Sequence, residues 1–237
     1  WTKCMNDELS RDSANRWNIV SQTVETCSAY LPVKNAQPFA NRDETKYAFL
    51  LEPKQESVLL TIGIGNDVGA EIEFKKQQPF TKFYGADPIA EHNEELYSKI
   101  GEFFQIAVGN ETKKSKASVL VNGTYVDRQM LHINAVYFIK NFVKQRFIDH
   151  LWLDAEGAEF GIYEMFHKYS EFDNAKIVIC QVNIETHSTG PHETSAFNRF
   201  VESLVAERKY VIVKSSNLSS DRLFFVNIES EYCREKF

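Results

Sequence analysis

Short apolar runs alternate with amphipathic stretches between about residues 57 and 228 of the chain. The runs are rich in Val, Ile, Leu and Phe, which is typical of strands that are buried on both faces of a sheet. We predict strands over residues 58–64, 80–86, 103–108, 148–153, 176–184, 210–213 and 223–228. We predict helices between them, over residues 68–78, 90–100, 134–146, 158–168 and 194–208.

The alternation of strands and helices predicts an α/β fold with a mainly parallel sheet that is covered on both faces, because parallel neighbours need long crossover connections. Only a polar loop separates the last two strands, so we expect them to form an antiparallel hairpin. Residues 116–130 break the alternation, and the turn pair Asn122-Gly123 predicts an irregular or hairpin insertion there. In such sheets ligands bind at the carboxyl ends of the strands, which is where we expect the chemistry.

Residues 1–56 have a mixed polar composition that three prolines interrupt. Apolar residues recur at helical spacing between Leu9 and Val24, which predicts a helix that packs on the rest of the chain. We therefore expect an N-terminal helical or irregular extension, residues 1–56, packed on a main domain that comprises residues 57–237.

The charge of the chain excludes some classes of partner. Its 237 residues include 27 Lys and Arg against 33 Asp and Glu, which gives a net charge of −6. This balance lacks the basic surplus that binds phosphate backbones, so we expect no nucleic-acid partner. No apolar run reaches the roughly 18–20 residues that span a bilayer. The chain begins with Trp1, and we interpret it as processed or trimmed, which leaves room for a removed N-terminal anchor.

The four cysteines form no Cys-x-x-Cys pair, so a zinc or redox motif is not expected. Cys4 and Cys27 lie in the extension and could pair, whereas Cys180 lies in an apolar strand and is interpreted as a buried thiol. Glycosylation sequons begin at Asn110, Asn122 and Asn217. The even cysteine count, the sequons and the missing start favour a lumen of the secretory pathway, Golgi or endoplasmic reticulum, over the cytoplasm, which is the alternative.

A glycine-rich turn, Gly63-Ile64-Gly65-Asn66-Asp67-Val68-Gly69, follows the first predicted strand. Such a turn lets the backbone approach a ligand and presents N–H groups at a helix start, although it can also serve packing alone. Asp87 and Pro88 end the second strand about 20 residues later, where a carboxylate can hold two ribose hydroxyls. A helix cap is the alternative role of Asp87. An adenosine ribose would belong to a dinucleotide or to S-adenosylmethionine.

Two polar clusters follow the fourth and fifth predicted strands. The first contains Asp154, Glu156 and Glu159, and carboxylates this close are costly without a cation or a proton. Helix capping explains some of them but not Asp154, which the strand should direct into the cleft. The second cluster alternates with apolar residues, so its members should share one face: Gln181, Asn183, Glu185 and His187. His187 is a candidate general base, with a structural role as the alternative.

Together these segments resemble the FkbM-domain family of S-adenosylmethionine-dependent methyltransferases. The likeness is carried by Leu153-Asp154-Ala155-Glu156-Gly157-Ala158-Glu159, which is similar to the family's Asp-x-Glu-Gly-Ala-Glu signature. The glycine turn and residues 84–88, 106–109 and 181–187 add to the likeness, which covers about residues 57–228. It implies a class I methyltransferase fold, a Rossmann-like sheet of seven mostly parallel strands with helices on both faces and a C-terminal antiparallel hairpin.

The resemblance also implies S-adenosylmethionine as the cofactor. Its amino-acid end would lie on the turn, its ribose at Asp87 and its adenine near the end of the third strand. The residues assigned to the cofactor in this way are Gly63, Ile64, Gly65, Asp87, Pro88, Ala107 and Val108. The catalytic candidates are His187, Asp154 and Glu156. A divalent cation held by Asp154, Glu156 and Glu185 is the other way to lower the pKa of a hydroxyl group.

One residue departs from the family pattern. Thr61 stands two residues before the first glycine, where methyltransferases of this class usually carry an acid that holds the donor's ammonium group. Asp67, Asn66 and Glu71 are the candidates to compensate for it. We predict an O-methyltransferase that acts on a sugar hydroxyl of a glycan or glycoside, with a carbohydrate or small molecule as acceptor. The alternatives are a non-catalytic binding or scaffold protein with a degenerate methyltransferase fold, and a nicotinamide-dependent oxidoreductase, which the longer glycine turn disfavours.

Overall fold

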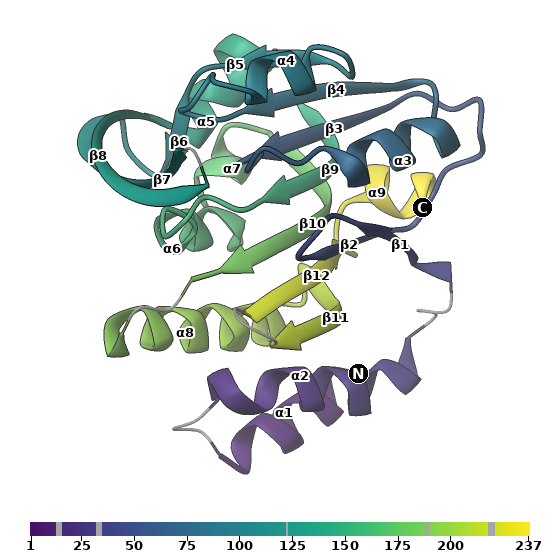
Figure 1. Cartoon of the computed structure of the whole chain (residues 1–237). Coiled ribbons are helices and arrows are strands. Elements are labelled where there is room, and N and C mark those ends of the chain that lie inside the picture. Colours follow the sequence, from purple (N-terminus) through teal and green to yellow (C-terminus); the bar gives the residue numbers. More distant parts are fainter. Residues whose placement is uncertain (13–15, 32–34, 122, 188–189, 218–220) are drawn as a thin grey trace.

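The computed structural model describes residues 1–12, 16–31, 35–121, 123–187, 190–217 and 221–237. A seven-stranded sheet in the order β11-β12-β10-β9-β3-β4-β5 forms the centre of the molecule (Figure 1). Its strands are β3 (Ser57–Ile62), β4 (Thr81–Ala86), β5 (Glu102–Phe104), β9 (Phe147–Leu153), β10 (Val178–Thr186), β11 (Tyr210–Asn217) and β12 (Asp221–Asn227). Only β12 runs against its neighbours β10 and β11. This is the strand arrangement of the class I methyltransferase fold, as the family resemblance implied.

Alternate residues of the central strands enter two separate cores, one on each face of the sheet. Leu60 and Leu151 belong to the larger core, and their neighbours Leu59 and Trp152 belong to the smaller one. The helices between the strands are α3 (Gly69–Gln77), α4 (Asn93–Tyr97), α5 (Ala135–Phe138), α6 (Glu159–Ile162), α7 (Glu171–Asn174) and α8 (Pro191–Glu207). The strands are thus buried on both sides, which explains their continuous apolar sequence.

The N-terminal extension packs on both faces of the sheet. The sequence predicted one helix in this extension, and the structure has two, α1 (Thr2–Ser10) and α2 (Arg16–Cys27). They lie beside β11 and α8 (Figure 1). Trp17 packs edge-on against Phe197 of α8, with ring centroids 4.6 Å apart. The short strands β1 (Gln37–Ala40) and β2 (Thr45–Ala48) form a hairpin that places Phe39 in the smaller core. The division of the chain at residue 56 stays a prediction.

The third predicted strand is divided in two. The backbone turns after β5, where Ile106 N donates to Phe104 O, and resumes as β6 (Ala107–Gly109). β6 belongs to a second sheet with the long hairpin β7 (Lys113–Val121) and β8 (Thr124–Asn134), in the order β6-β8-β7. The predicted hairpin insertion is therefore confirmed, although Asn122 of its turn lies outside the described residues.

Three predicted helices are shorter than their sequence pattern suggests. Residues 90–100 form only α4 (Asn93–Tyr97). Residues 134–146 form α5 and a π-helical turn (Ile139–Val143), which ends at Lys144 in the left-handed conformation. Residues 158–168 form α6 and a 3-10 turn (Tyr163–Phe166). A last helix, α9 (Glu231–Lys236), was not predicted.

The interpretation of Cys180 as a thiol is wrong, because Cys180 is bonded to Cys233 on α9. The helix is also fixed by Asp149 of β9, which accepts from Tyr232 Oη at 3.0 Å and pairs with Lys236 at 2.8 Å. The second disulfide joins Cys4 to Cys27, as the sequence allowed. Two disulfides are typical of a protein that folds in an oxidising compartment. In the described part of the chain, no helix combines the length and apolarity needed to cross a membrane.

We expect non-reducing peptide mapping to recover the two bonds Cys4–Cys27 and Cys180–Cys233. The double variant Cys180→Ser/Cys233→Ser should lose about 4 kcal/mol of unfolding free energy in urea titrations, because the bond closes a long loop and anchors α9. The matched variant Cys4→Ser/Cys27→Ser, which opens a shorter loop, should lose about 3 kcal/mol. Unmodified thiols at positions 180 and 233 in the native protein would contradict the assignment.

Candidate functional site

A pocket of about 950 Å³, including the solvent at its mouth, opens at the carboxyl ends of β3, β4 and β9. The structure brings every residue assigned to the cofactor into its lining: Gly63, Ile64, Gly65, Asp87, Pro88, Ala107 and Val108. Asp154 and Glu156 line the same pocket. The β7–β8 hairpin supplies Val119, Leu120 and Tyr125, which no motif in the sequence indicated.

The two glycines of the turn serve different purposes. Gly63 has φ +84°, and a Cβ at this position would lie 1.6 Å from the carbonyl oxygen of Asp154. Any side chain there would push β3 away from β9. Gly65 has φ +62°, and a Cβ there would meet nothing within 4 Å. The first glycine therefore permits close packing of the strands, and the second leaves a cradle that a ligand can fill.

Asp87 links the end of β4 to the glycine turn. One of its carboxylate oxygens accepts from Ile64 N at 2.9 Å, and the other accepts from Ile89 N at 2.8 Å. Burial raises the pKa of Asp87, and the hydrogen bonds from these amides oppose that effect. Both sequence interpretations are therefore compatible with its position, because the carboxylate caps local backbone and also lines the pocket.

Thr61 is buried at the base of the turn and is bonded to an acid from the next helix. Its hydroxyl donates to Glu71 Oε1 at 3.0 Å and accepts from Tyr97 Oη at 3.1 Å. Burial raises the pKa of Glu71, while the charge of Lys46 lowers it. Of the residues proposed to compensate for Thr61, only Asp67 lines the pocket. Its two oxygens accept from Gly69 N and Arg42 N, each at 2.9 Å.

His187 lies just beyond β10 and is surrounded by carboxylates. Its Nδ1 is 3.0 Å from Glu159 Oε1. Its Nε2 is 3.4 Å from Glu185, 3.6 Å from Glu156 and 3.7 Å from Asp154. Burial alone would lower the pKa of His187, but hydrogen bonds to Glu159 and Glu185 and the charge of Asp154 raise it to about 11. At neutral pH the ring is an imidazolium, which cannot accept a proton.

Asp154 belongs to the same cluster, but its pKa lies close to neutral pH. Burial, reinforced by Glu185 and Glu156 and partly offset by His187 and Lys46, raises its pKa to about 7. Its Oδ1 is buried and accepts no hydrogen bond from the described residues. Asp154 can therefore exchange a proton near neutral pH, at a point that faces the pocket.

Glu159 is a structural member of the cluster. It is fully buried, with Oε2 accepting from Gly157 N at 2.8 Å and Oε1 accepting from His187 N at 2.9 Å. These bonds hold the loop after β9 against the end of β10. Glu156 lies in this loop and has φ +47°, a left-handed conformation that allows the tight turn.

The polar residues of β10 share one face, as expected, but two of them bind the backbone of the extension. Asn183 accepts from Tyr47 N at 2.7 Å and donates to Tyr47 O at 2.8 Å. Gln181 makes the same pair of contacts with Phe49, at 2.8 and 3.0 Å. Glu185 instead pairs with Arg222 of β12, at 2.9 and 2.8 Å.

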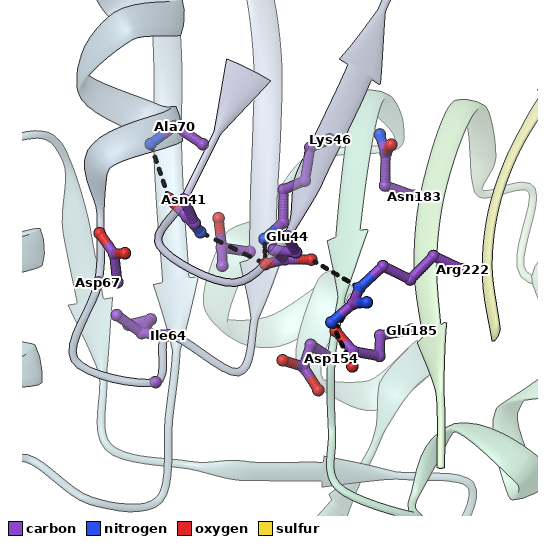
Figure 2. A network of polar contacts seen from close by, with 12 residues as sticks. Asn41, Glu44, Lys46, Ile64, Asp67, Ala70, Asp154, Asn183, Glu185 and Arg222 are labelled. Carbon is purple, nitrogen blue, oxygen red and sulfur yellow. Dashed lines mark hydrogen bonds and ion pairs between the residues drawn. The ribbon is translucent and has the colours of Figure 1, made fainter. Parts of the chain in front are cut away.

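The hairpin that these side chains hold brings residues to the site that the sequence analysis missed. Asn41, Asp43 and Glu44 of the loop between β1 and β2 line the pocket. Glu44 contacts Lys46, lies 3.3 Å from Asn41 Nδ2 and reaches within 4.0 Å of Arg222 (Figure 2). Burial lowers the pKa of Lys46, while Glu71, Asp154 and Glu185 raise it. The segment has two adjacent acids, Asp43 and Glu44, but no glycine turn and no place at the end of a predicted strand, so only its packing reveals its position at the pocket.

A cation could be held by Asp154, Glu185 and His187, each of which offers one ligand atom within 4.8 Å of the others. The predicted set was Asp154, Glu156 and Glu185. The structure keeps two of these residues and offers His187 in place of Glu156. Both oxygens of Glu185 already bind Arg222, and His187 is held by Glu159. The cluster thus balances its charge with cationic side chains of its own.

A second, wider groove of about 2030 Å³, including open solvent, runs between the β7–β8 hairpin and α6. It meets the first pocket at Ala155, Glu156 and Ala158, which line both. Trp17 and His187 line the groove, as does Asn110 of the first sequon, whose side chain packs against Gly161. The other two sequons include residues outside the described part of the chain.

The sequence model of the family described as Methyltransferase FkbM domain matches residues 24–212, well over half of the chain. A search of curated proteins finds no match.

Among solved structures, the chain is similar to TrmK from M. capricolum in complex with S-adenosylhomocysteine, with 15% identity, a TM-score of 0.38, and 74% of this chain and 63% of that chain covered. It is also similar to Aeropyrum pernix fibrillarin with natively bound S-adenosylmethionine, with 10% identity, a TM-score of 0.42, and 83% and 84% covered. Precorrin-6y C5,15-methyltransferase from Geobacter metallireducens gives 11% identity, a TM-score of 0.39, and 74% and 82% covered. This chain thus spans 63% of TrmK, and at these identities the likeness concerns the fold alone.

We expect His187 to remain protonated on both ring nitrogens at pH 8, because four carboxylates lie within 3.7 Å of the ring. Two-dimensional ¹H–¹⁵N NMR of the histidine rings, recorded in EDTA, measures this directly. In the variant Glu159→Gln the pKa of His187 should fall towards the ordinary histidine range. A neutral His187 ring at pH 8 in the unmodified protein would contradict the assignment.

Proposed function

The chain belongs to the FkbM family of methyltransferases, and from this premise we propose that it is an O-methyltransferase whose acceptor is a sugar hydroxyl of a glycan or glycoside. The observation that carries the proposal is the continuity of the two cavities at Glu156. A hydroxyl group in the groove can pass Glu156 into the first pocket, which Asp154 lines.

The family's cofactor is S-adenosylmethionine, and the residues of the pocket fit it. The open cradle above Gly65, the carboxylate of Asp87 and the apolar wall of Ala107 and Val108 suit its amino-acid end, ribose and adenine. The bound donor supplies a methyl group on a sulfonium sulfur that is already activated. The protein therefore needs chiefly to align the acceptor and to remove its proton.

We assign the general base to Asp154 and not to His187, which stood first among the sequence candidates. A sugar hydroxyl is a poor nucleophile until its proton is shared with a base. Asp154, with its pKa raised to about 7 and one oxygen without a hydrogen bond, is suited to accept that proton. The imidazolium of His187 then acts as a positioning group, because it holds the carboxylates of Glu156 and Asp154.

The groove has the composition of a carbohydrate site. An indole ring such as that of Trp17 can cover the apolar face of a sugar, while carboxylates and amides bind its hydroxyls. Asn110, Asp127 and Glu193 are polar groups of this kind in the lining. The two disulfides support our further proposal that the protein acts in the lumen of the secretory pathway.

A second mechanism is favoured by the cluster of Asp154, Glu185 and His187, which could hold a divalent cation that activates the hydroxyl. This mechanism requires that the cation displace the proton of His187 and share Glu185 with Arg222. Chelation separates the two mechanisms, because the base mechanism needs no metal.

We expect calorimetric titration to show S-adenosylmethionine binding to the unmodified protein and a loss of about tenfold or more in affinity for Asp87→Ala, because the ribose loses its carboxylate partner. Glu91→Gln, an exposed acid beyond the same strand, is the matched control and should bind normally. No binding to the unmodified protein would leave the non-catalytic scaffold as the function.

With a panel of glycosides as acceptors, we expect methyl transfer to survive EDTA and Asp154→Asn to lower kcat by a factor of about 10²–10⁴ at unchanged donor affinity. The control Asp127→Asn, in the groove but away from the base, should change KM for the acceptor and spare kcat. Loss of transfer in EDTA, restored by a divalent cation, would replace the base mechanism with the metal mechanism.

A further inference from the structure

The pocket assigned to the donor has a strongly negative lining. The carboxylates of Asp43, Glu44, Asp67, Asp87, Asp154 and Glu156 face it. Among the described residues that line it, there is no Lys or Arg. S-adenosylmethionine carries two positive groups, a sulfonium and an α-ammonium, against one carboxylate. The negative charge of the lining therefore complements the positive charge of the donor. The donor's ammonium group needs a carboxylate partner, because burying an unpaired charge is costly.

Most of these carboxylates are already committed to other groups. Asp87 and Asp67 each use both oxygens to accept from backbone amides. Asp154 and Glu156 are each within 3.7 Å of the cationic ring of His187. Asp43 and Glu44, on the loop between β1 and β2, are the two that remain, and of these Glu44 also contacts Lys46 and Asn41.

The loop is fixed to the glycine turn and to the start of α3. Arg42 N donates to Asp67 Oδ2 at 2.9 Å. Ala70 N donates to Asn41 Oδ1 at 2.8 Å (Figure 2). The loop therefore holds one position relative to Gly63 and Gly65, which line the same pocket. Through the bond from Arg42 to Asp67, the loop is joined to the same turn that carries the open cradle above Gly65.

We propose that Asp43 and Glu44 bind the α-ammonium group of the donor, so that the N-terminal extension completes the donor site. This inference rests on donor binding by the pocket, as proposed above. In the described part of the chain, no hydrogen bond or ion pair occupies the side chain of Asp43, which is exposed at the pocket. Glu44 is half-buried and is oriented by Lys46 and Asn41. Thr61 and Glu71, neither of which lines the pocket, then stabilise the turn.

The test compares two ligands by calorimetry: S-adenosylmethionine and 5′-methylthioadenosine, which has the same adenosine but no amino-acid end. Asp43→Asn should weaken S-adenosylmethionine binding about tenfold and leave methylthioadenosine within about twofold of the unmodified protein. Glu44→Gln should show the same pattern if it folds, because it also removes a partner of buried Lys46. Glu25→Gln, an exposed acid of the same extension, is the matched control and should bind both ligands normally.

Donor affinity of Asp43→Asn within about twofold of the unmodified protein would overturn the proposal, whatever Glu44→Gln does. An equal loss of both ligands would also overturn it, because the loop would then only support the pocket. Failure of the unmodified protein to bind either ligand would instead refute the proposed function, so the two failures are distinguishable.

Discussion

The close approach of Gly63 to the backbone of Asp154 is the contact on which the rest of the site depends. Asp154 N donates to Ile62 O at 2.8 Å, and the missing side chain of Gly63 lets the ends of β3 and β9 come together. The glycine turn and Asp154 therefore share one wall of the pocket. A parallel sheet supplies this arrangement because all of its carboxyl ends meet at the same edge.

Around that wall the protein must hold many carboxylates at short distances, and it does so with cations drawn from three different parts of the chain. Lys46 comes from the extension, His187 from the end of β10 and Arg222 from the C-terminal hairpin. Each is close to more than one acid, so none of the pairs is independent. A single charge change in this network should alter the protonation of its neighbours as well as the local contact.

Local patterns in the sequence were enough to predict the sheet, the glycine turn and the Asp154–Glu159 tract, because each of these depends on residues that are close along the chain. The rest depends on contacts between distant segments. Cys180 pairs with Cys233 on a helix too short to leave a periodic pattern, and β5 and β6 separate because β6 pairs with an inserted hairpin. The protonation of His187 could not be predicted, since the four acids that set it become neighbours only in the folded chain.

The two side-chain amides of β10 that bind the extension also fix the register of its hairpin. A side-chain amide that donates to a carbonyl and accepts from the N–H of the same residue imitates one rung of a β-ladder, and Asn183 and Gln181 supply two successive rungs to Tyr47 and Phe49. A slip of the hairpin by one residue would turn its side chains over and bring Ala48 to the amides. The position of the β1–β2 loop at the pocket is therefore set by the other half of the sheet, through two side chains that do not themselves line the pocket.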